Sequence, residues 1–341
     1  SEMSSKIQKG EVLLDIKGLK IQGFSDEKWH DIINGVDIYL RRGEVMGLIG
    51  ESGAGKSTLG LAAMGYTQPG CRITDGEIKF DGVDLAKLNE NEKRKYWGNR
   101  MTYVAQSAAA SFNPAHRLVK QTTASAIRSG FKDAKEAYKD AKELYRTLNL
   151  PDPNNIGDRY PHQVSGGQLQ RVMTAMAMSP RPDLIIFDEP TTALDVTTQV
   201  GVLSSMRAIV EEFNTAAIYI THDLAVVAQM ADFIKVLRYG DEVEEAPTKE
   251  MLKNPKEAYT KSLWSVRSIE KEKISPQAPI LEIKDLDAAY GSTKVLHKIN
   301  ISVPCGSTVA VVGESGSGKS TAARVITGLL PQLNGEVKFE G

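Results

Sequence analysis

"GESGAGKST", which spans Gly50–Thr58, decides the fold of this chain, and the nearly identical "GESGSGKST" spans Gly313–Thr321. Both stretches fit the pattern G-x-x-x-x-G-K-[ST], and each lies between an apolar run and a segment of helical composition. Glycines let the backbone turn tightly and bring its N–H groups close to phosphate, and the following helix directs its positive end to the same place. The sequence therefore predicts two phosphate-binding loops, each between a strand and a helix of an α/β domain.

Charged and hydroxyl side chains accompany the first loop. Lys56 offers a point charge to the outer phosphates of a nucleotide, and Ser57 offers a hydroxyl to Mg²⁺. Leu184–Phe187 is entirely apolar, as expected of a strand covered on both faces, and it ends in Asp188 and Glu189. Ligands bind at the carboxyl ends of such strands. We expect Asp188 to hold Mg²⁺ and Glu189 to deprotonate an attacking water, the alternative being a solvated acidic turn.

A further strand is predicted at Ala216–Ile220, and His222 follows it. A lone histidine is more often structural than catalytic. This one is placed at the same sheet edge as Asp188 and Glu189, so we expect it to contact the γ-phosphate. Lys56, Glu189 and His222 are therefore the predicted catalytic residues.

The chain repeats itself. "LLDIKGL" at 13–19 resembles "ILEIKDL" at 280–286, and "GEIKFDG" at 76–82 resembles "GEVKFEG" at 335–341. The offset between the copies is 267 residues at the first of these pairs, 263 at the phosphate loops and 259 at the second pair. The first copy therefore carries about four extra residues in each of two connecting segments, and we expect these residues to form loops. We predict a complete domain over 1–264 and an exposed linker over 265–279. The N-terminal part of a second domain then occupies 280–341.

Composition bounds the partners. Forty-two basic and 43 acidic side chains give a net charge of -1, which gives no reason to expect nucleic acid as a partner. No apolar run approaches the ~18 residues of a membrane helix, so we expect any membrane role to run through a partner. Cys71 and Cys305 match no metal or redox spacing and are expected to be reduced thiols.

"VSGGQLQR" at 164–171 narrows the class. Ser165 is a good N-cap before two glycines and a helix-forming run, which makes a second anion site that must serve another nucleotide. Here the chain resembles the ATP-binding-cassette (ABC) ATPases, whose signature is Leu-Ser-Gly-Gly-Gln, with Val164 in place of leucine. The resemblance implies a P-loop NTPase fold with a mixed central sheet, an antiparallel β subdomain and a helical insertion at about 107–164. It also implies cassettes packed head to tail, with ATP between the loop of one and the signature of the other.

Further residues match the family's motifs. Gln106 in "YVAQ" matches the Q-loop glutamine, and Asp195 in "TTALD" matches the D-loop. Tyr290 resembles the aromatic that stacks on adenine; in the first copy this is Phe24, with Trp29 as the alternative. The ATP contacts implied are Phe24, Gly50, Glu51, Ser52, Gly53, Ala54, Gly55, Lys56, Ser57, Thr58, Gln106, Ser165, Gly166, Gly167, Gln168, Asp195, Tyr290, Gly313, Glu314, Ser315, Gly316, Ser317, Gly318, Lys319, Ser320 and Thr321. The Mg²⁺ ligands implied are Ser57, Gln106, Asp188 and Ser320.

Two smaller matches favour a subfamily. "SAAASFNPAHRLVKQ" after Gln106 and "NPKEAYTKSLW" at 254–264 resemble segments of oligopeptide and dipeptide importers. The resemblance implies an ATPase on the cytoplasmic face of the bacterial inner membrane, where it powers import of peptides or related solutes. Permease subunits would be direct partners and an external substrate-binding protein an indirect one. Some members hold an iron–sulfur cluster through cysteines after this tail; this sequence has none there, so we expect no cluster.

Alternatives remain open at this point. A soluble tandem protein acting on ribosomes or DNA would be expected to carry a long basic linker or a coiled-coil insertion, and an inert binding module would not need the acids and the histidine. Two phosphate loops with one signature suggest that the native chain continues past Gly341. The first signature would then complete the site at the second loop, in cis, and a homodimer is the alternative.

Overall fold

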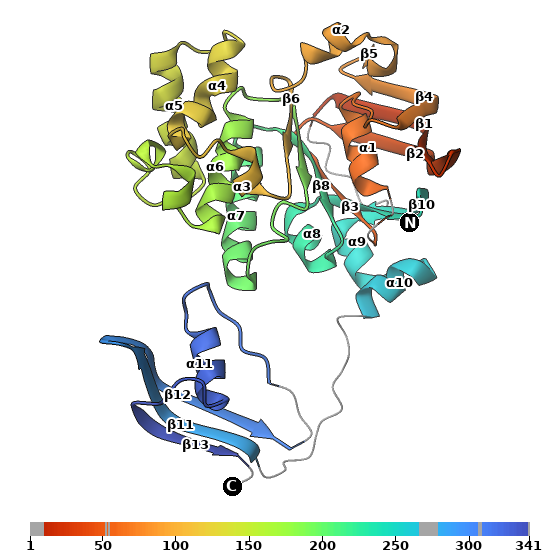
Figure 1. Cartoon of the computed structure of the whole chain (residues 1–341). Helices are drawn as coiled ribbons and strands as arrows, with labels where there is room; N and C mark the ends of the chain where they lie inside the picture. Colours follow the sequence, from red (N-terminus) through yellow and green to blue (C-terminus); the bar gives the residue numbers. More distant parts are fainter. Residues whose placement is uncertain (1–9, 52, 54, 266–278, 306–308, 340–341) are drawn as a thin grey trace. The chain divides into compact units, whose positions relative to one another are not determined.

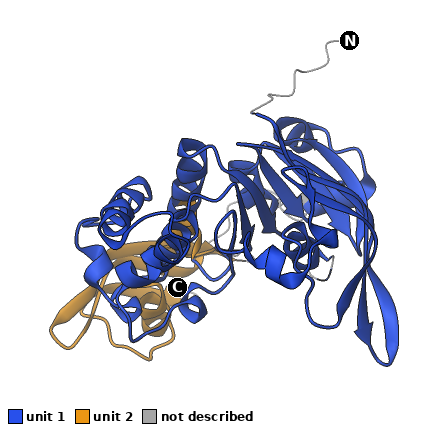
Figure 2. Cartoon of the chain, turned by 90° about the horizontal axis from the view of Figure 1, so that it is seen from above, with its two compact units in different colours: residues 1–194, 201–267 blue, residues 195–200, 268–341 orange. Residues whose placement is uncertain are grey.

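A six-stranded sheet forms the centre of the first unit. The computed structural model describes residues 10–51, 53, 55–265, 279–305 and 309–339, and it divides into a unit of residues 1–194 and 201–267 and a unit of residues 195–200 and 268–341 (Figure 2). Five strands of the central sheet run parallel and the edge strand β10 runs antiparallel, so the predicted mixed sheet is confirmed. Its order is β10 (Asp241–Pro247), β9 (Phe233–Arg238), β3 (Val45–Ile49), β8 (Ala216–Thr221), β7 (Leu184–Asp188) and β6 (Met101–Val104).

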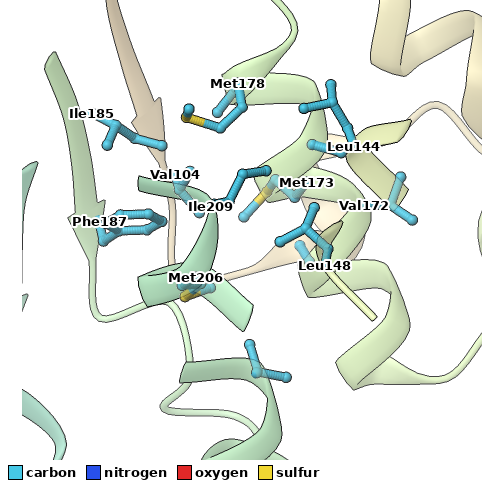
Figure 3. Close-up of a cluster of buried hydrophobic side chains, with 14 of the residues drawn as sticks. Val104, Leu144, Leu148, Val172, Met173, Met178, Ile185, Phe187, Met206 and Ile209 are labelled. Atoms are coloured by element: carbon cyan, nitrogen blue, oxygen red, sulfur yellow. The ribbon is translucent and has the colours of Figure 1, made fainter. Parts of the chain in front are cut away.

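Both faces of this sheet are covered, which explains its apolar strands. In β7, Ile185 and Phe187 pack into one buried cluster, whereas Leu184 and Ile186 pack into another on the opposite face. The first cluster joins the sheet to α5 (Ala134–Thr147), α6 (Gly166–Met178) and α7 (Val196–Glu212), as Figure 3 shows. Met173 and Met178 belong to it, so the methionines after the signature are core residues there.

The second cluster joins the central sheet to α1 (Lys56–Ala63) and to an antiparallel sheet beside it (Figure 1). The strand order of that sheet is β2 (Lys28–Arg41), β1 (Val12–Ser25), β4 (Cys71–Phe80) and β5 (Val83–Asp84). The extra residues of the first copy lie here and extend strands, so the expectation that they form loops was wrong. Phe24 pairs with Trp29 at the end of the β1–β2 hairpin, and Cys71 of β4 pairs with Gly23. The two insertions hydrogen-bond to one another as added sheet, which satisfies their backbone groups.

Helices fill the segment between Gln106 and the signature, as predicted for a helical insertion. Apolar side chains of this segment recur at helical spacing and are buried: Ala137, Ala141, Leu144, Tyr145 and Leu148. The elements are α3 (Ala108–Ser111), α4 (Leu118–Arg128), α5, η2 (Ile156–Asp158) and η3 (Pro161–Gln163). The other helices of this unit are η1 (Leu85–Lys87), α2 (Glu90–Arg94), α8 (Leu224–Met230), α9 (Thr248–Lys253) and α10 (Ala258–Ser265).

The second unit repeats the antiparallel sheet and the loop helix. Its strands β12 (Thr293–Pro304), β11 (Pro279–Tyr290) and β13 (Asn334–Phe339) pair in that order, and α11 spans Lys319–Ile326. Residues 309–312, where a strand was expected before the second loop, form none, and Val312 is 73% exposed. The matching β3 lies between β8 and β9, and the described residues of the second unit supply no such neighbours. The linker predicted over 265–279 lies mostly outside the described residues.

No helix in the described part of the chain is both long enough and apolar enough to cross a bilayer.

Candidate nucleotide site

The first phosphate loop joins β3 to α1 and presents a buried lysine. Gly55 precedes α1 with φ +92°, the left-handed region that favours glycine. Lys56 is 6% exposed, and its Nζ donates to the carbonyl oxygens of Gly50 at 2.5 Å and Glu51 at 3.0 Å. Burial lowers the pKa of Lys56, against the opposing charges of Glu189 and Asp188. The lysine is therefore a desolvated cation held by two backbone oxygens.

The structure also describes Gly53 and Thr58, two further predicted residues of the first loop. Gly53 has φ +84°, and the Thr58 hydroxyl donates to Gln68 Oε1 at 3.2 Å. Ser52 and Ala54, predicted to contact ATP, lie outside the described residues.

Ser57 and Asp188 meet, as expected of a shared Mg²⁺ site. Ser57 Oγ donates to Asp188 Oδ1 at 3.1 Å, which joins the start of α1 to the end of β7. A hydroxyl and a carboxylate are oxygen donors of the kind that Mg²⁺ prefers, so these two residues fit the metal. Gln106 is exposed between β6 and α3, and the hydrogen bonds described for Asp188 do not include it.

Tyr103 is a site residue that the sequence did not reveal. Its hydroxyl donates to Asp188 Oδ2. Burial, together with the bond to Asp188, raises the pKa of the Tyr103 phenol, so it stays a donor. Its only signal in the sequence is a hydroxyl within the otherwise apolar end of the strand before Gln106.

Glu189 and His222 also meet, across the carboxyl ends of β7 and β8. His222 Nδ1 lies 2.6 Å from Glu189 Oε1, and the Glu189 N–H donates to the Ile220 oxygen at 2.9 Å. Glu189 has φ +45°, a left-handed conformation that is uncommon outside glycine and that turns the chain as it leaves β7. Non-glycine residues held in such conformations cluster at functional sites. The predicted base and the predicted γ-phosphate contact are thus one hydrogen-bonded pair.

The signature forms the N-terminus of α6. Ser165 Oγ accepts the Gln168 N–H at 3.2 Å, and Gln168 Oε1 accepts the Ser165 N–H at 3.1 Å, which makes a capping box. Ser165 and Gly166 are exposed and Gly167 is buried. Asp195 accepts the Thr198 N–H at 2.9 Å, and this bond holds the pKa of Asp195 below its usual range.

The second loop has the geometry of the first. Gly318 precedes α11 with φ +98°, Gly316 has φ +84°, and Lys319 Nζ donates to the oxygens of Gly313 at 2.5 Å and Glu314 at 2.8 Å. Ser320 and Thr321 begin the helix as Ser57 and Thr58 do in the first copy, and Ser315 and Ser317 lie within the turn.

The predicted adenine-stacking aromatics lie at the ends of the two hairpins. Phe24 and Trp29 contact each other edge to face at 5.3 Å between ring centroids, and Phe24 is 53% exposed. The Arg72 guanidinium covers the Trp29 ring at 3.8 Å, which leaves Phe24 the more accessible ring. Tyr290 accepts a hydrogen bond from Arg324 of α11 at 2.7 Å.

Both cysteines are free, Cys71 half-buried and Cys305 exposed, and no group of three or more metal-ligating side chains occurs in the described part of the chain.

The sequence profile of the ABC transporter family matches residues 33–192 and 296–341. The chain belongs to the ABC transporter family. It is 40% identical to the oligopeptide transport ATP-binding protein AppD of Bacillus subtilis, over 74% of this chain and 77% of that protein. It is 32% identical, over 96% of its length, to the glutathione import ATP-binding protein GsiA of Salmonella typhimurium, of which it spans 60%.

Solved structures agree with this assignment. One is the ATP-binding cassette MJ0796 in a dimeric post-hydrolysis state bound to ADP and Pi. It is 25% identical to this chain and superposes with a TM-score of 0.60, over 69% of this chain and 99% of that one. The fold of cbiO1 from Clostridium perfringens also matches, at 21% identity and a TM-score of 0.60, over 72% of this chain and 92% of that one. The resemblance on which the sequence analysis rested, and the ABC-type fold it implied, are confirmed.

Proposed function

We propose that this chain is an ATP-binding and ATP-hydrolysing subunit that powers import through a bacterial ABC transporter, with peptides or related small solutes as cargo. One observation carries the proposal: Ser57–Asp188 and Glu189–His222 form two hydrogen-bonded pairs at the sheet edge that also holds Lys56. The relatives named for oligopeptide transport and glutathione import support the cargo class.

Each side chain has a distinct role. Lys56 gives up its two carbonyl partners for the outer phosphates of ATP, and its burial strengthens that attraction. Ser57 and Asp188 hold Mg²⁺, which when bound neutralises charge on the phosphates. Glu189 accepts a proton from the attacking water, and His222 orients the Glu189 carboxylate and faces the γ-phosphate. Gln106 is a further ligand of this ion, and Ser320 is the Mg²⁺ ligand at the second loop.

The signature, whose Ser165 and Gly166 are exposed, serves a second cassette, in cis or in a homodimer. Ser165, Gly166, Gly167 and Gln168 contact the ATP bound at the opposing loop, and Asp195 lies at the same interface. The dimeric state of the MJ0796 cassette supports this arrangement. Permease subunits are the membrane partners and a substrate-binding protein acts through them, so the chain works at the cytoplasmic face of the membrane.

Phosphate release from MgATP tests the assignment. In a Lys319→Ala background, which silences the second loop, Glu189→Gln should retain ATP binding and slow hydrolysis by about 10²–10⁴-fold, the contribution of a general base. Glu143→Gln is the matched control, because Glu143 is an exposed residue of α5 paired with Arg146. Hydrolysis by Glu189→Gln at the rate of the control would remove Glu189 from the role of base.

A further inference from the structure

The tail motif at 254–264 takes no part in the site described above. It contains α10, the last helix of the first unit, and Glu244 of β10 anchors its start. Glu244 Oε2 accepts the Lys256 N–H at 3.1 Å, and Oε1 accepts the Glu257 N–H at 3.0 Å. Both N–H groups lie directly before α10, so this carboxylate ties the start of the helix to the edge of the central sheet.

Tyr259 carries this tail to the phosphate loop. Its ring packs with Leu263 against the buried cluster that contains Ile49, the last residue of β3. The Arg238 guanidinium lies 4.8 Å from the ring centroid, within cation–π range. The Tyr259 hydroxyl accepts the N–H of Glu51, the second residue of the loop, at 3.2 Å.

One peptide group is therefore held from two sides. In the peptide between Gly50 and Glu51, the oxygen accepts from Lys56 Nζ at 2.5 Å and the N–H donates to the Tyr259 hydroxyl. In a trans peptide these two groups point in opposite directions, so the lysine and the tyrosine together fix the orientation of the peptide plane. When Lys56 turns to a phosphate, the Gly50 oxygen loses the lysine, and Tyr259 continues to hold the other edge.

The geometry points to Tyr259 as a positioning residue for the first phosphate loop, through which nucleotide binding at Lys56 and the packing of α10 are coupled. The inference rests on the proposed function, because the coupling requires a nucleotide at this loop. Coupling of this kind is reciprocal: if α10 favours nucleotide binding through Tyr259, nucleotide stabilises α10 by the same factor. Since α10 ends at Ser265, the effect reaches the last described residue of the first unit.

The test uses the full chain in a Lys319→Ala background, with MgADP as the probe. Tyr259→Phe removes the hydroxyl and keeps the ring, and we expect it to weaken MgADP binding by about threefold to tenfold, the fold-change of one lost hydrogen bond. Tyr239→Phe is the matched control, because the same Arg238 guanidinium lies 5.5 Å from the centroid of the Tyr239 ring and Tyr239 is 67% exposed. Calorimetry gives the affinities.

Amide hydrogen exchange of residues 256–265 is a second measurement, and its response to MgADP would not change if the role of Tyr259 were purely structural. MgADP should slow this exchange in the Tyr239→Phe protein and leave it unchanged in Tyr259→Phe. Glu244→Gln, which loosens α10 without touching the loop, should speed the exchange and weaken MgADP binding.

The outcomes are distinguishable. Equal MgADP affinity in Tyr259→Phe and Tyr239→Phe, with equal slowing of exchange in α10, overturns the coupling and leaves the nucleotide site intact. Absence of MgADP binding in the Lys319→Ala parent overturns both the coupling and the proposed function.

Discussion

Gly55→Ala should damage the first loop by a collision that can be separated from backbone strain. Gly55 has φ +92°, where an L side chain costs roughly 1–2 kcal/mol. A Cβ placed there would also lie 2.8 Å from Ile33 Cδ1 and 3.2 Å from the Ile32 oxygen. The second contact is to backbone, which cannot rotate away, so overpacking adds about 1–3 kcal/mol.

Gly82→Ala is the matched control for Gly55→Ala. Gly82 lies between β4 and β5 with φ +81°, and a Cβ there would meet nothing within 4 Å. It therefore carries the strain without the collision. Because alanine restricts the unfolded chain equally at both positions, the two free energies of unfolding should differ by about 1–3 kcal/mol in urea titrations.

The same displacement should impair the site. Moving the start of α1 away from Ile33 costs at least one charged hydrogen bond to phosphate, so MgATP affinity should fall by about tenfold to a hundredfold in Gly55→Ala. Equal unfolding free energies and equal MgATP affinities in the Gly55→Ala and Gly82→Ala proteins would refute the reasoning.

Two further predictions concern ion pairing and the Mg²⁺ site. Arg100 pairs with both Asp183 at 2.8 Å and Asp81 at 2.9 Å. Arg100→Ala should therefore lower the free energy of unfolding by about 1–2 kcal/mol, whereas the surface control Arg94→Ala should lower it by no more than ~0.5 kcal/mol. Because Arg100 lowers the pKa of Asp81, the difference in unfolding free energy between the Arg100→Ala and Arg94→Ala proteins should be present above about pH 4 and shrink below it. The same difference in urea titrations at pH 7 and pH 3 would contradict the pairing. Tyr103→Phe should keep the free energy of unfolding within ~1 kcal/mol of that of the parent protein. It should shift the Mg²⁺ concentration for half-maximal ATP binding by about tenfold, since a charged hydrogen bond contributes about 1.5–3 kcal/mol. An unshifted Mg²⁺ titration would exclude Tyr103 from holding Asp188.

Local chemistry made much of the site predictable from the sequence. The loop pattern requires left-handed glycines and places Lys56 beside the loop carbonyls, whichever domain surrounds it. Ser165 and Gln168 form a capping box from their spacing alone. Asp188 ends β7 and His222 directly follows β8, so these polar side chains come to one edge because parallel strands share their carboxyl ends.

Features that depend on neighbouring elements were not predictable in this way. The added residues near Phe24 and Cys71 form strand because each insertion supplies the other's hydrogen-bond partner. Residues 309–312 have strand composition but lack, within the described residues, the flanking strands that β3 has. Tyr103 and Tyr259 reach the site through tertiary packing, which no local pattern encodes.

The central claim is that the first loop binds ATP through Lys56. Its most direct test is calorimetric titration of MgATP into the Lys319→Ala protein and into the double variant Lys56→Ala/Lys319→Ala. The account predicts binding in the single variant and its loss, or a weakening of a hundredfold or more, in the double variant, because a buried cation that pairs with phosphate is removed. Equal affinity of the two proteins for MgATP would contradict the account.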